Sequence, residues 1–206
     1  LTEAVAIGNA TARSILFGPK DPKNYIYPGK AGYWQTGFPG GSHEYLVNKG
    51  NGGRDMDGRT LFFYLATVNT PAMALEIPGV GSQYAFSSRD GGGAYLNGSN
   101  TYKLNIPANP PAQKFWSFVV YDPQTRSMLQ TGEMPYPSKN NKRNADMVKN
   151  ADGSIDLYFG PQAPAGMEAN WVKTVPGKGW FGIFRLYGPG QQWFDRTWKL
   201  GNIEKV

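Results

Sequence analysis

Two apolar runs decide the fold: FWSFVVY at residues 115–121 and WFGIFRLY at residues 180–187. Successive side chains of a β-strand point to opposite faces, so an apolar residue at nearly every position requires that both faces be covered. In the first run the two alternating sets are Trp116, Phe118 and Val120 against Phe115, Val119 and Tyr121. We therefore expect strands with one face on a second sheet and the other under the N-terminal helices, or under a domain absent from this chain.

Shorter strand-forming runs at 83–89, 101–106 and 155–159 accompany these two. Turn-forming segments at 90–93 and 150–153 separate them. This alternation of short strands and turns is typical of a β-sandwich or barrel. Ahead of them, residues 1–17 carry apolar side chains at helical spacing, and the continuous apolar run at 59–66 favours a buried helix. The sequence thus predicts a mostly β chain of one structural domain, with a helical and loop-rich portion over 1–78 and an antiparallel β-sandwich over 79–206.

The composition excludes several kinds of site. With no cysteine and a single histidine, thiolate chemistry is absent and a tightly held transition metal is not expected. The net charge of +6 favours anionic partners, but the basic residues are scattered and form no nucleic-acid module. No run approaches the roughly 18 apolar residues of a membrane span. Because the chain lacks an initiator Met and a signal-peptide pattern, we expect a fragment or processed product.

Catalytic and cofactor motifs are not recognisable. A serine triad would have to use His43 with Ser42 or Ser82, and the sequence around Ser82 lacks the G-x-S-x-G elbow. The segment NADGSID at 150–156 is interpreted as a hairpin turn and not as a calcium loop, since the distal glutamate is missing. The glycine-rich segments at 91–93 and 177–179 fit neither the P-loop nor the dinucleotide-binding motif, so no cofactor is predicted. A carboxylate pair for glycoside hydrolysis could be drawn from Asp122, Glu133 and Glu168. Sequence separation does not give the distance between them, so this alternative is left open.

Charged residues beside the aromatic strands give the candidate ligand site. Alternation places Arg185 on the same face as Phe181, Ile183 and Tyr187, where a charge must be paired or must bind something. We expect Asp122 to pair with the nearby Arg126, and Asp122 or Asp156 to pair with Arg185. The alternatives are a structural network and a clamp for an anionic ligand or a glycan stacked on tryptophan. The candidate ligand-binding residues are Asp122, Arg126, Lys178, Trp180, Arg185 and Tyr187.

An ordered series of motifs runs through the second half of the chain. It comprises GVGSQY at 79–84, FWS at 115–117, YDPQTRSMLQ at 121–130, NADGS at 150–154, YFGP at 158–161, NW at 170–171, TVPGKGW at 174–180 and RLYGP at 185–189. This series resembles the bacterial family catalogued as domain of unknown function 1214, and residues 1–78 match it more loosely. The resemblance implies a jelly-roll-like sandwich with a helical insertion, a preceding partner domain catalogued as 1254, and a periplasmic or secreted location. It implies no established activity.

Three functional hypotheses follow. The first is a non-catalytic binding or structural half of an exported two-domain protein, holding a glycan or a small anionic ligand between Arg–Asp pairs and aromatic rings. The second is a carboxylate-dependent hydrolase or lyase completed by a missing N-terminal domain. The third is a homo-oligomeric scaffold. A polar cleft with a perturbed carboxylate would favour the enzyme, whereas a filled Arg–Asp network would favour the first hypothesis.

Overall fold

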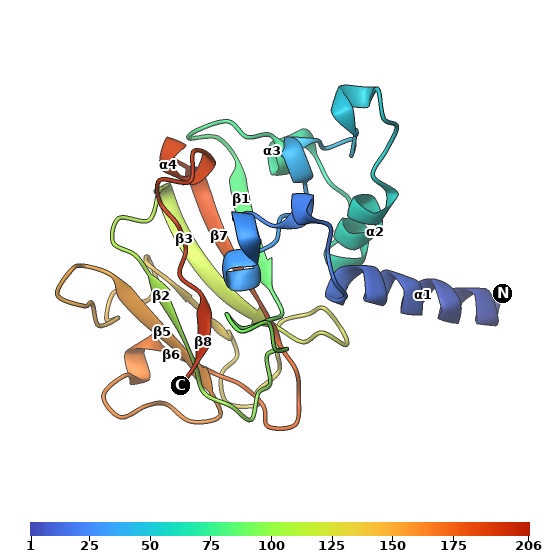
Figure 1. The fold of residues 1–206 in the computed structure, drawn as a ribbon. Coiled ribbons are helices and arrows are strands. Elements are labelled where there is room, and N and C mark those ends of the chain that lie inside the picture. The colour runs from blue at the N-terminus through green and yellow to red at the C-terminus, as the bar shows by residue number, and fades with distance from the viewer.

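The computed structural model describes residues 1–29, 33–48 and 50–206, and it contains two sheets and a set of helices (Figure 1). The α-helices of the described residues are α1 (Thr2–Phe17), α2 (Met56–Leu65), α3 (Pro71–Ala74) and α4 (Gln191–Phe194). Their strands are β1 (Ser82–Ser87), β2 (Tyr102–Ile106), β3 (Ala112–Tyr121), β4 (Ser138–Asn140), β5 (Ile155–Gly160), β6 (Trp171–Lys173), β7 (Phe181–Pro189) and β8 (Ile203–Lys205). The fold is therefore mixed α/β, with strands as the more frequent element.

The strands form two sheets of four. The first has the order β1-β7-β3-β4 and is antiparallel throughout; the second has the order β6-β5-β2-β8. In the second sheet β6 runs parallel to β5, so the prediction of a purely antiparallel fold is wrong there. The cause is the connection: a loop with a short 3-10 turn at Glu168–Asn170 brings the chain back before β6 begins, where a tight hairpin would have reversed it.

One apolar core lies between the two sheets. Phe118 of β3 and Phe159 of β5 are fully buried, and their ring centroids are 4.8 Å apart. Trp116 and Phe184 from the first sheet, with Leu104 and Leu157 from the second, belong to the same buried cluster. These residues are the inward members of the alternating sets, so the predicted contact between one strand face and a second sheet is confirmed.

The outer face of the first sheet carries the helical portion. Leu16 of α1 and Leu61 of α2 pack with Phe86, Phe181 and Ile183 of the strands in a second buried cluster. Only the last turns of α1 take part, because its first ten residues are solvent-exposed and the helix extends away from the sheets (Figure 1). The prediction that N-terminal helices cover this face is confirmed for α2 and for the end of α1.

The five predicted strands and both predicted helices are present, with boundaries shifted by a few residues. The sequence did not indicate β4, β6 and β8, each of which has only three residues. Pairing with a longer neighbour holds such short strands, so their own sequence carries little periodic signal. Across the described residues, no helix combines the length and the apolar character needed to cross a bilayer.

Candidate functional site

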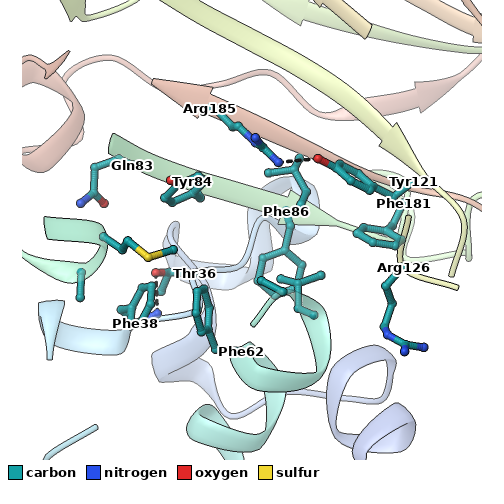
Figure 2. Close-up of a pocket in the computed structure, with 16 residues that line it drawn as sticks. Thr36, Phe38, Phe62, Gln83, Tyr84, Phe86, Tyr121, Arg126, Phe181 and Arg185 are labelled. Atoms are coloured by element: carbon teal, nitrogen blue, oxygen red, sulfur yellow. Dashed lines mark hydrogen bonds between the residues drawn. The ribbon is translucent and has the colours of Figure 1, made fainter. Parts of the chain in front are cut away.

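A cavity of about 310 Å³ lies on the outer face of the first sheet, where the helical portion covers it incompletely (Figure 2). Its floor comes from β1, β3 and β7, and its roof comes from α2, α3 and the segment around Phe38. The lining is mostly apolar or aromatic: Gly37, Phe38, Phe62, Leu65, Ala66, Met73, Ala74, Tyr84, Phe86, Tyr121, Phe181 and Ile183, joined by Thr36, Gln83, Arg126 and Arg185.

Strand register brings the floor together. Tyr84 of β1 is paired with Arg185 of β7, and Phe86 is paired with Ile183. Tyr121 of β3 is paired with Phe181 across the other edge of β7, and the two rings stack at 5.2 Å. Alternate residues of three neighbouring strands thus point to one side, which is the side away from the second sheet.

Arg185 is the charged residue of this floor. Its side chain is partly buried, one terminal nitrogen donates a hydrogen bond to the Tyr121 hydroxyl, and the hydroxyl of Tyr187 also interacts with it. Its carbon Cζ lies 5.8 Å from the centroid of the Tyr84 ring and 5.9 Å from that of Tyr121. Its Nε is buried and has no acceptor. The guanidinium is therefore surrounded by phenol groups.

No carboxylate of the described residues forms an ion pair with Arg185. The predicted partners are elsewhere: Asp122 pairs with Lys178, and Asp156 contacts Lys103 and Asn105. The predicted pairing of Arg185 with Asp122 or Asp156 is wrong, because Arg185 points away from the second sheet, which carries Asp156, and Lys178 pairs with Asp122.

The protonation states near Arg185 are fixed by burial and by the cation. Burial raises the pKa of Tyr121, although the neighbouring Arg185 charge opposes this, so Tyr121 is a neutral phenol at neutral pH. Burial would lower the pKa of Arg185, but Tyr121 and Tyr187 outweigh it and the pKa is raised. Since the Tyr121 oxygen accepts from Arg185, its own O–H proton is available to donate.

Arg126 is at the other end of the lining. It lies over the ring of Tyr64 at 4.1 Å, and one terminal nitrogen donates to the Tyr64 hydroxyl at 3.2 Å and to the carbonyl of Gln124 at 2.9 Å. Its guanidinium points away from the middle of the cavity (Figure 2). Of the predicted set, Arg126 and Arg185 line the cavity, with Tyr187 beside Arg185.

The other three predicted residues are not in the cavity lining. Asp122 and Lys178 form an ion pair of 2.9 Å, and the expected Asp122–Arg126 side-chain pair is absent because Lys178 occupies the carboxylate. Trp180 is 2% exposed and packs in the core against Tyr102 and Phe159, which leaves no open ring face for a sugar. The structure therefore separates the predicted set into a cavity group, an ion pair outside the cavity and a core residue.

Most of the cavity lining was missed from the sequence. Tyr84 and Phe86 had a usable signal, since they share one face of a predicted strand. Phe38, Phe62 and Met73 had none, because they reach the cavity from segments whose packing against the sheet depends on the tertiary fold. The Phe38 and Phe62 rings also contact each other, with centroids 4.3 Å apart and both side chains buried.

A second, polar cavity of about 280 Å³ lies under the end of α1, beside Lys20, Lys23, Asp55 and Asp57. Burial, with a contribution from Arg89, lowers the pKa of Lys20 to about 8. Local structure accounts for most of these groups: Lys20 donates to carbonyls at the end of α1, and Asp55 caps α2 and pairs with Lys23 at 3.1 Å. This cavity therefore offers weaker grounds for a ligand than the first.

The remaining sequence motifs have structural roles. The backbone N–H of Ser154 donates to the Asp152 carboxylate and Gly153 has φ +82°, which confirms the turn at 150–153. Over the described residues, no cluster of three or more His, Asp or Glu side chains could hold a metal ion. The backbone carbonyl of His43 accepts from Asn69, and Ser42 accepts from the N–H of Leu46.

Solved structures of two bacterial proteins resemble this chain, and the first of them supports the fold. The VPA0106 protein from Vibrio parahaemolyticus has a TM-score of 0.55 and 22% identity, over 80% of this chain and 39% of that one. An uncharacterised protein from Burkholderia cenocepacia has a TM-score of 0.40 and 20% identity, over 67% of this chain and 34% of that one. The chain thus spans about 39% of the length of the Vibrio protein.

Among curated proteins, none matches the sequence significantly. One family model matches residues 81–191, which include β1, β3 and β7 with the floor of the cavity. This match covers more than half of the chain. The chain therefore belongs to the family described as Protein of unknown function (DUF1214).

Proposed function

We propose that this chain is a non-catalytic binding domain that holds a small organic anion in the cavity above β1, β3 and β7. The observation that carries the proposal is Arg185, a cation in an apolar cavity with a buried Nε that lacks an acceptor. An arginine cannot lose its proton at working pH, so a partly buried guanidinium with an unpaired Nε is stabilised by an anion beside it. The described protein residues supply none, and a bound carboxylate would.

The lining favours an organic anion over a sugar. A glycan needs a hydrogen-bond partner for most of its hydroxyl groups, because an unpaired polar group in an apolar site costs roughly 1–3 kcal/mol. Apart from the two arginines, the polar side chains of the lining are Thr36, Gln83 and the phenols of Tyr84 and Tyr121. A ligand with an apolar body and a single charged end fits this distribution better.

The same lining speaks against catalysis at this site. The described residues that form it include no carboxylate, histidine, lysine or serine, which are the groups that most often act as acid, base or nucleophile. The hydrolase or lyase alternative requires a carboxylate pair. Asp122 is held by Lys178 outside the cavity, so this alternative has less support.

The proposal is tested by isothermal titration of the purified chain with 3-phenylpropanoate and with octanoate, each at neutral pH. At least one is expected to bind, and Arg185→Met is expected to weaken that binding by about tenfold or more, because a hydrogen bond to a charged group contributes roughly 1.5–3 kcal/mol.

The matched control is Arg143→Met. Arg143 also lies over a tyrosine ring, at 5.2 Å from Tyr136, and also donates to a hydroxyl, but it is exposed and outside the cavity. Equal affinity of wild type and Arg185→Met, or no binding of either carboxylate by the wild type, would contradict the proposed function.

Three finer points belong to the same proposal and rest on the family resemblance. We propose a jelly-roll-like topology for the two sheets, a preceding domain of the type catalogued as 1254, and a location outside the cytoplasm. The common core of the two sheets supports the first point. The intact mass of the native protein and fractionation of the source cells test the other two.

A further inference from the structure

The shape and charge of the cavity narrow the ligand class, on the premise that the proposed function is correct. We infer that the ligand is an aromatic monocarboxylate with one ring or two fused rings, bound with its carboxylate at Arg185 and Tyr121 and its ring between Phe181 and the Phe38–Phe62 pair.

The volume sets the size. An apolar cavity of about 150 Å³ accommodates one benzene molecule, and ligand pockets commonly start near 300 Å³. The present cavity of about 310 Å³ is about twice the volume of that benzene-binding cavity. A single ring with a short carboxylate arm, or a fused bicyclic acid, fills such a space, whereas a long acyl chain or an oligosaccharide exceeds it.

Aromatic side chains from the sheet and from the helical portion both line the space. Phe181 stacks on Tyr121 on the floor with an interplanar angle of 19°, and Phe38 and Phe62 approach to 4.3 Å on the roof (Figure 2). Rings in offset or edge contact gain roughly two- to tenfold in affinity beyond what area burial provides. A flat aromatic ligand therefore gains contacts here that a saturated ring of equal size does not.

One charged group is expected on the ligand. Arg185 and the free proton of Tyr121 together offer adjacent donors to a planar carboxylate. Arg126 offers no second anchor of the same kind, because its guanidinium points away from the cavity and lies against Tyr64 and the carbonyl of Gln124. A second carboxylate on the ring would meet apolar side chains and would lose affinity.

A matched ligand series on the wild-type chain tests the inference by isothermal titration. 3-Phenylpropanoate is expected to bind about tenfold more tightly than 3-cyclohexylpropanoate, although the saturated ring is the more hydrophobic of the two. 2-Naphthoate is expected to bind at least about tenfold more tightly than the neutral 2-naphthamide. Naphthalene-2,6-dicarboxylate is expected to bind more weakly than 2-naphthoate.

The outcomes separate this inference from the proposed function. Equal or tighter binding of 3-cyclohexylpropanoate or octanoate would overturn the aromatic class and leave the binding function standing. Tighter binding of the dicarboxylate would overturn the assignment of a single charge. Failure of every carboxylate to bind would defeat the proposed function as well.

Two variants of adjacent residues on α2 localise the ring. Phe62→Leu keeps an apolar side chain in the cavity and is expected to reduce the preference for the phenyl over the cyclohexyl ligand to about twofold or less. Phe63→Leu is the control, because Phe63 is 42% exposed and does not line this cavity. An unchanged preference in a folded Phe62→Leu variant, verified by its thermal melt, would place the ring elsewhere.

Discussion

The two faces of the first sheet are built from the same strands but are packed differently. On β7, Phe184 and Leu186 point to the second sheet and are completely buried. One position away, Ile183 and Arg185 point to the helical portion and line the cavity. The inner face is filled by apolar side chains; the outer face retains empty volume and a cation. Both faces read as apolar in the sequence, so the difference depends on what covers each.

This contrast favours the outer face as the place of the proposed ligand. A close-packed interior has no room for a ligand and tolerates little change in volume. A face covered incompletely by helices and loops can hold a ligand and adjust to substitutions. Measurements that compare matched substitutions on the two faces therefore test the assignment of the site directly.

The largest expected effect is the loss of a ring from the inner face. Phe118→Ala is expected to lower the free energy of unfolding by roughly 3–5 kcal/mol, because Phe118 is fully buried against Phe159 and Trp34. Phe86→Ala on the outer face is expected to cost less, because the vacated space joins an existing cavity. Urea denaturation of both variants measures the difference, and a greater loss for Phe86→Ala would contradict the contrast.

Adding a methyl group should show the same asymmetry at a smaller scale. A Cβ at Gly182 would lie 2.2 Å from the Phe118 ring, and a Cβ at Gly37 would lie 2.9 Å from the Phe62 ring. Gly182→Ala is expected to cost roughly 1–3 kcal/mol, since the filled inner face cannot yield. At Gly37 the ring can move into the cavity, so the expected cost is within about 0.5 kcal/mol. Equal costs in thermal and urea melts would show that the cavity gives no such freedom.

The sequence predicts the strands better than it predicts which side chains meet in the cavity above them. The runs at 115–121 and 180–187 identify two central strands because apolar alternation is a local property. The position of Arg185 on the outer face followed from the same alternation. Its surroundings did not, because Tyr84 and Tyr121 reach it through the register of β1 and β3 against β7, which local sequence does not encode. The roof residue Phe62 was equally hidden, since it meets the sheet only in the folded chain.

Arg185→Met tests the contrast between the two faces by removing the charge from the outer face. Among the described residues no carboxylate pairs with Arg185, so the substitution leaves no buried charge unpaired. It is expected to leave the free energy of unfolding unchanged or to raise it by about 1 kcal/mol, because it removes a partly buried cation and keeps the apolar stem. Arg185→Ala, which also removes the stem, is expected to be the less stable of the two. A loss of more than about 2 kcal/mol in Arg185→Met would indicate a structural role for the charge.

A small effect is also expected at the Asp122–Lys178 pair, which was assigned to the ligand site from the sequence but lies outside the cavity lining. Burial would raise the pKa of Asp122, but the Lys178 ammonium and the N–H groups of Gln124 and Thr125 outweigh it and hold the pKa below its ordinary value of 3.8. A carboxyl group whose pKa is lower in the folded than in the unfolded state stabilises the fold above the unfolded pKa, and this stability is lost as the pH falls through the folded value.

Asp122→Asn keeps the oxygen that accepts from Gln124 and removes only the charge. Because the Lys178 side chain is 52% exposed, the expected loss at pH 7 is about 0.5–1 kcal/mol. The stability difference from wild type should vanish in acid, where wild-type Asp122 is also protonated, and carboxylate binding at the cavity should be unchanged. A difference that persists in acid, or a loss of ligand affinity in Asp122→Asn, would return this pair to the functional site.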